Sequence, residues 1–157
     1  MKRYLAVLLL LALSICSTFA AEEEKPITKD IALKAIALFR ANPGSEDGRG
    51  AAAIIVRFAE ASPDVTITLS KDLLPWVGTN PGSKYESLLL AAYVAGSTQA
   101  QLLNAKSGDD RLAGTMLLNE TYLKLQQDEP NLHIEAIEKL MELQKQGKLK
   151  EYLESIQ

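Results

Sequence analysis

Proline and glycine divide this chain into segments of helical length, and that division limits the folds it can adopt. Within the segments, apolar residues recur every three or four positions, which is the period of an amphipathic helix. We therefore expect an all-α protein with about six helices in three antiparallel hairpins, packed as an irregular bundle. The predicted helices cover 28–41, 46–61, 83–104, 107–128, 131–146 and a last short stretch after Gly147.

Capping residues mark the predicted beginnings of several helices. Thr28 and Ser45 precede the first two, and Asn131 precedes the fifth. Ser83 and Glu86 have the spacing of a capping box, in which the hydroxyl and the carboxylate each accept a backbone N–H of the first turn. These residues support the segment boundaries independently of the apolar pattern.

Two glycines have distinct predicted roles. Gly96 lies one turn from Ala92 in a run of apolar and small residues, where it would let a neighbouring helix approach closely. Gly147 follows a predicted helix and suits the left-handed conformation that ends one.

One segment departs from the helical pattern. Residues 65–69 alternate apolar and hydroxyl side chains, which predicts a short extended segment. With no second strand candidate nearby, it cannot form a sheet by itself. Ser70 to Leu74 then predicts a single helical turn that ends before Pro75.

The tetrapeptide Asn-Pro-Gly-Ser occurs twice, at 42–45 and at 80–83, which raises the alternative of a helical repeat. Aligning the two copies matches little beyond a generic core pattern. Leu118, Tyr122 and Leu125 fit the second helix of a tetratricopeptide unit, but the Trp and Gly-Tyr signature is absent. A short array of that type remains the alternative to the irregular bundle.

The N-terminus has the organisation of an export signal. Lys2 and Arg3 precede ten apolar residues, and small residues allow cleavage after Ala20. We expect 1–20 to be a cleaved signal peptide, 21–27 a flexible acidic segment and 28–157 a single helical domain. The expected location is the periplasm or the extracellular space. The alternative is a lipid anchor on Cys16, which the preceding Ile15 disfavours.

Cleavage would change the chemistry of the chain. It removes the only cysteine and two of the 17 basic residues, leaving 15 against 20 acidic residues and a net charge of −5. Without clustered Lys and Arg, nucleic acid is not expected as a partner. Membrane contact is expected only through the signal or, less favourably, lipidation at Cys16.

Catalytic residue types are scarce. His133 is the only histidine, and it lies near the beginning of a predicted helix, where a surface or packing role is typical. There is no Gly-x-Ser-x-Gly motif, and one histidine without cysteine does not make a zinc site. We expect no cofactor, no metal and no enzymatic activity.

One connection suggests a binding role. Leu74, Trp76 and Val77 gather apolar side chains in a Pro-broken loop, and Trp is enriched at binding hot spots. The alternative is that Trp76 fills the interior of the bundle. The tyrosines are expected to pack in the core rather than to stack on a ligand; they are Tyr85, Tyr93 and Tyr122.

The sequence thus favours an exported, non-catalytic interaction or adaptor module that binds another protein or a second copy of itself. The alternative is a small-ligand-binding protein, or a hydrolase with a pocket between helices.

Overall fold

The structure is a computed structural model, and it describes residues 26–79, 84–104 and 108–156. Six helices and no strands occur in these residues. The predictions for the signal peptide, Cys16 and the acidic segment before Pro26 lie outside the described residues, as does Ser83 of the predicted capping box. The helices are α2 (Lys29–Ala41), α3 (Glu46–Ala61), α4 (Lys84–Asn104), α5 (Arg111–Asp128), α6 (Glu135–Lys145) and α7 (Leu149–Ser155).

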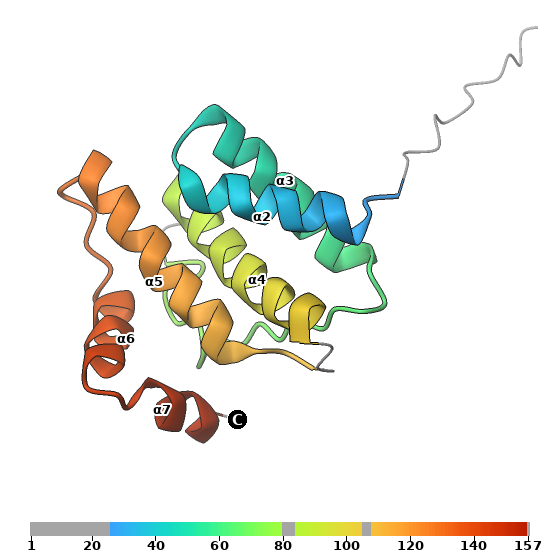
Figure 1. The fold of residues 1–157 in the computed structure, drawn as a ribbon. Helices are drawn as coiled ribbons and strands as arrows, with labels where there is room; N and C mark the ends of the chain where they lie inside the picture. The colour runs from blue at the N-terminus through green and yellow to red at the C-terminus, as the bar shows by residue number, and fades with distance from the viewer. Residues whose placement is uncertain (1–25, 80–83, 105–107, 157) are drawn as a thin grey trace, which may run out of the picture.

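The all-α prediction is confirmed, and the helices pack as a bundle around α4. Figure 1 shows α4 between the α2–α3 pair and α5, with α6 and α7 on the other side of α5 from α4. Neighbours in the sequence pack against each other, and α2 also contacts α4 while α5 contacts α7. The main core runs through all of these contacts and includes Phe39, Leu89 and Tyr122.

The predicted caps explain where several helices begin. The Thr28 hydroxyl accepts the N–H of Ile31, and the Ser45 hydroxyl accepts the N–H of Gly48 at 2.9 Å. The cap of α5 was not predicted: Asp110 accepts the N–H of Ala113 at 3.0 Å, so this helix begins at Arg111 rather than at 107. These side chains satisfy N–H groups that have no partner within the helix.

The beginning of α6 differs from the prediction. The helix begins at Glu135 rather than at 131, and its N-cap residue, Ile134, makes no side-chain capping bond. Tyr122 of α5 is the reason, because its hydroxyl accepts the Ile134 N–H at 2.9 Å and has two acceptors for its proton, the Glu138 carboxylate at 2.8 Å and the Leu132 carbonyl at 3.0 Å. These bonds hold the segment before Glu135 outside the helix.

Residues 65–69 lie outside any helix or strand, and Thr66 pairs with a side chain instead of a strand. The buried Gln101 amide accepts the Thr66 N–H at 2.9 Å and donates to the Thr66 carbonyl at 3.0 Å. A side chain thus supplies the bonds that a neighbouring strand would supply. After this segment, the Leu74 N–H bonds the Ser70 carbonyl at 2.9 Å, which confirms the single predicted turn.

Candidate functional site

The loop that carries Leu74, Trp76 and Val77 lies against the bundle. Leu74 and Trp76 are 3% and 4% exposed and belong to the main core, while Val77 is 37% exposed. The Val77 N–H donates to the Leu74 carbonyl at 3.1 Å, and Thr79 donates twice to the Trp76 carbonyl. These three residues therefore form no exposed apolar patch, and Trp76 has the packing role that the sequence left open.

A groove of about 650 Å³ lies instead over α4, α5 and α6, with the end of α2 at its edge. Its walls are mainly apolar, with amide and charged side chains around them. The lining residues are Arg40, Gly96, Gln99, Ala100, Leu103, Ala113, Met116, Leu117, Asn119, Glu120, Leu123, Met141, Gln144 and Lys145. Cavities of this size hold side chains of a partner or a small ligand.

Three large apolar side chains in the groove face solvent. Leu103 is 62% exposed, and Met116 and Leu123 are each 48% exposed. Met116 and Leu123 are seven residues apart, so they lie on one side of α5 two turns from each other. Isolated exposed apolar residues are ordinary, but three that converge on one groove from two helices mark a candidate binding surface.

The groove owes its shape to a close contact between α4 and α5. A Cβ atom on Gly96 would lie 2.3 Å from the Ala113 carbonyl oxygen, so only glycine allows this approach. On the facing helix, a Cβ atom on Gly114 would lie 2.8 Å from the Tyr93 ring. The close approach predicted for Gly96 is confirmed, and it brings the apolar residues of both helices to one surface.

Charged residues mark the α2 edge of the groove. The Arg40 guanidinium donates to one Glu120 carboxylate oxygen at 2.6 Å, and the Lys124 ammonium donates to the other at 3.0 Å. Partial burial raises the pKa of Glu120, but the hydrogen bonds from Arg40 and Lys124 outweigh it and hold this pKa below its usual value. Glu120 is therefore ionised at neutral pH and balances one of its two cations.

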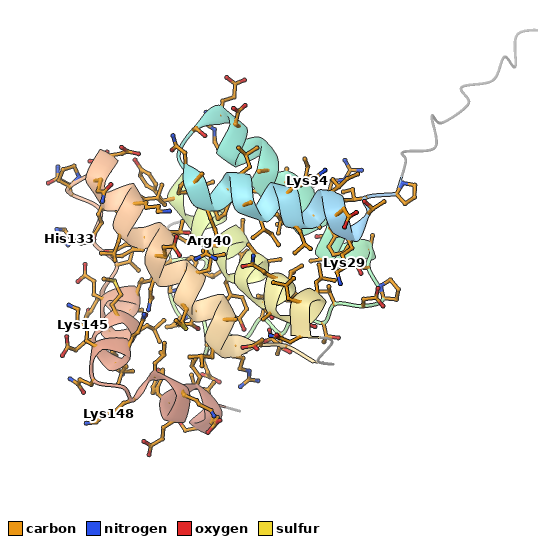
Figure 2. All side chains as sticks on the ribbon, viewed as in Figure 1. Lys29, Lys34, Arg40, His133, Lys145 and Lys148 are labelled. Atoms are coloured by element: carbon orange, nitrogen blue, oxygen red, sulfur yellow. The ribbon has the colours of Figure 1, made fainter. Side chains whose placement is uncertain are left out.

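The α6 edge carries a further cation and an amide pair. Lys145 is exposed and forms no ion pair with any residue that the structure describes. Beside it in the groove, the buried Asn119 amide donates to the Gln144 side-chain oxygen at 2.7 Å. Figure 2 shows Arg40 and Lys145 on opposite sides of α5, so cations stand at both edges of the groove.

A second cavity, of about 560 Å³, lies between the Trp76 loop and residues 131–136. Glu86, His133 and Glu135 line it. The Glu86 carboxylate accepts the Gly78 N–H at 2.9 Å, and the exposed His133 ring lies 3.1 Å from Glu138. Glu86 and His133 thus each contact a different neighbour, and these two contacts do not join them into one polar site.

A partly buried polar cluster joins α4 to the beginning of α5. The Asp109 carboxylate accepts hydroxyl protons from Tyr93 at 2.9 Å and from Ser97 at 2.7 Å, and also the Thr68 N–H at 3.3 Å. Burial, and then the adjacent Asp109 charge, raise the pKa of Tyr93 well above its usual value. The cluster fastens the 65–69 segment to the bundle, and His133 bonds Glu138 rather than this carboxylate.

Within the described ranges, no three His, Cys, Asp or Glu side chains are grouped so that they could hold a metal ion. Nor does any helix in the same residues have the length and apolar character needed to cross a membrane. No family model matches the chain, and no curated protein or solved structure is significantly similar to it. Inference about function therefore rests on the geometry of the groove.

The sequence carries one sign of this groove, which is a second apolar stripe on the helix that becomes α5. Leu118, Tyr122 and Leu125 follow the buried side of α5, whereas Met116 and Leu123 lie on the opposite side. A helix with two opposed apolar stripes cannot bury both against one core. The second stripe was the indication of a partner surface.

Proposed function

We propose that this chain is an exported, non-catalytic binding module whose groove over α4, α5 and α6 receives a helix of another protein. The observation that carries the proposal is the convergence of Leu103, Met116 and Leu123 on one groove. An amphipathic helix satisfies its own backbone and presents apolar side chains three and four residues apart, which suits an apolar groove of this kind.

The groove favours a helix over an extended peptide. Met116 and Leu123 lie two turns apart on α5, and Leu103 faces the same opening from α4. The side chains of a partner helix would pack between these three, as the side chains of neighbouring helices pack within the bundle. An extended peptide would instead need a row of backbone donors and acceptors, and no strand in the described part of the chain offers one.

Selection from a library of displayed helical peptides tests this proposal. The library would carry randomised apolar and polar residues on a helical frame of about 18 residues, roughly five turns. The mature chain is the bait, and the variants Met116→Glu and Leu123→Glu are counter-baits. Leu69→Glu is the matched control, because Leu69 is 53% exposed and lies outside the groove.

We expect enriched peptides with apolar residues on one helical face, which bind the native chain and Leu69→Glu but not the two groove variants. All three substitutions replace exposed side chains, so circular dichroism should report unchanged folding. Enrichment of no peptide, or of peptides that bind all four proteins equally, would overturn the proposal.

A further inference from the structure

The charges around the groove define the partner more closely, and this inference rests on the proposed function. Arg40 and Lys145 line the groove, Lys124 adjoins it through Glu120, and Glu120 is the single acid among the lining residues. The groove thus has local positive charge in a chain whose overall net charge is −3, or −5 after removal of residues 1–20.

The position of these cations bears on how a partner would lie. Arg40 stands at the end of α2 and Lys145 at the end of α6, on opposite sides of α5. A helix that lies along the stripe of Met116 and Leu123 would therefore have a cation on each flank. Such a helix carries its apolar residues in the middle of the contact face and its polar residues on both sides.

We infer that the partner is an amphipathic helix with acidic residues on both flanks of its apolar face. Lys145 is open to an incoming carboxylate, because it has no ion pair within the described residues. Arg40 is engaged with Glu120, yet its side chain remains 43% exposed and can meet a second carboxylate. A basic helix would instead meet Arg40, Lys124 and Lys145 with like charge.

A second copy of the chain fits these charges less well. This chain is acidic overall, so a second copy carries helices with acidic residues. Each copy, however, also carries the same groove with the same cations. A symmetric pair would bring Arg40 and Lys145 of one copy towards the same cations of the other, since a two-fold interface uses one patch twice. We therefore assign the groove to a different protein.

Two synthetic helical peptides test the inference. Both carry the same leucine face, and they differ only in having glutamate or lysine on the two flanks. Fluorescence anisotropy would measure the Kd of each peptide for the mature chain, for Lys145→Glu and for Lys71→Glu at low salt. Lys71 is the matched control, because it is exposed and lies outside the groove.

We expect the glutamate peptide to bind the native chain about tenfold more tightly than the lysine peptide. This preference should shrink at least severalfold in Lys145→Glu, remain in Lys71→Glu and weaken as salt is raised. Equal affinity of the two peptides would overturn the inference while the proposed function stands. Failure of both peptides to bind would contradict the proposed function itself.

Sedimentation equilibrium of the native chain and of Leu123→Glu completes the experiment. We expect both to be monomeric. A dimer that Leu123→Glu dissociates would show that the groove is covered by a second copy, and it would overturn the acidic partner.

Discussion

Substitution of Gly96 by alanine tests the contact that shapes the groove. The added Cβ would lie 2.3 Å from the Ala113 carbonyl oxygen and 2.9 Å from the Leu117 Cβ atom. A backbone carbonyl cannot rotate away as a flexible side chain can. To restore an ordinary separation of about 3.4 Å, α4 and α5 would have to move apart by roughly 1 Å.

The expected cost follows from two opposed contributions. Overpacking of a close helix contact destabilises a protein by about 1–3 kcal/mol, and more where the obstacle is rigid. Alanine recovers about 1 kcal/mol relative to glycine within a helix. Because the obstacle to Gly96→Ala is backbone, we expect a gross cost of about 3 kcal/mol and a net loss of unfolding free energy of about 2 kcal/mol.

The control is Gly50→Ala in α3. A Cβ atom on Gly50 meets nothing within 4 Å, and the residue is exposed. The same chemical change should therefore stabilise the chain by about 0.5–1 kcal/mol. The two substitutions differ only in what surrounds the new methyl group.

Urea unfolding of the chain, followed by circular dichroism, measures both variants. With a slope of about 2 kcal/mol per molar urea, the midpoint should fall by about 1 M for Gly96→Ala and rise slightly for Gly50→Ala. If Gly96→Ala is as stable as the native chain, or shifts in the same direction as Gly50→Ala, the glycine contact does not constrain the two helices.

Three further predictions concern polar contacts. Tyr122→Phe should lower the unfolding free energy by about 1–2 kcal/mol, because it leaves the Ile134 N–H without its acceptor. Burial is the main cause that raises the pKa of Tyr122 to about 12. The contribution of this hydroxyl to the free energy of unfolding is therefore full below about pH 10 and is lost as the pH rises from about 10 to 12. Unfolding curves of Tyr122→Phe at increasing pH should lack this part of the loss of stability in alkali. Gln101→Ala should speed hydrogen exchange of the Thr66 N–H at least tenfold, and unchanged exchange would refute the side-chain pairing. Partial burial of Glu120 is outweighed by the hydrogen bonds from Arg40 and Lys124, which lower its pKa. The stabilising contribution of this carboxylate is therefore fully present above about pH 4.5 and is lost as the pH falls through the lowered pKa. Glu120→Gln should cost less than ~1 kcal/mol at pH 7 and should reduce the loss of stability that unfolding curves show in acid.

Local chemistry allowed the sequence to predict most of the helices. The caps at Thr28 and Ser45 act within one turn of themselves, so their meaning does not depend on the rest of the fold. Gly147 likewise adopts a positive φ of 72° after α6, as its position predicted. Elements defined by neighbouring residues are thus accessible from sequence alone.

Long-range bonds account for what the sequence did not predict. Asn131 resembles a cap, but the Tyr122 hydroxyl ten residues before Leu132 holds the chain extended and delays α6. The pairing of Thr66 with Gln101, 35 residues away, has no local signature either. Such contacts depend on which helices meet, and apolar periodicity does not determine that.

The candidate site failed to emerge from sequence for a related reason. Trp76 is a plausible anchor in isolation, yet the loop folds back and buries it at 4% exposure. The apolar residues of α5 form two opposed stripes, and only the packing shows that the stripe of Met116 and Leu123 is the uncovered one. A binding surface consists of exposed residues, and tertiary packing determines which residues are exposed.

Binding can be tested apart from folding in this molecule, because Leu123 lines the groove and contributes little to the core. Gly96 acts through the buried contact between α4 and α5, so its substitution should change stability and also the shape of the groove. Leu123 is already half exposed and gains little from folding, so its substitution should change binding with almost no effect on stability. A single exposed leucine is ordinary, but Leu103, Met116 and Leu123 expose their apolar area to water together, on one groove. Occupation by a partner is the reason that the groove's charge and shape support best.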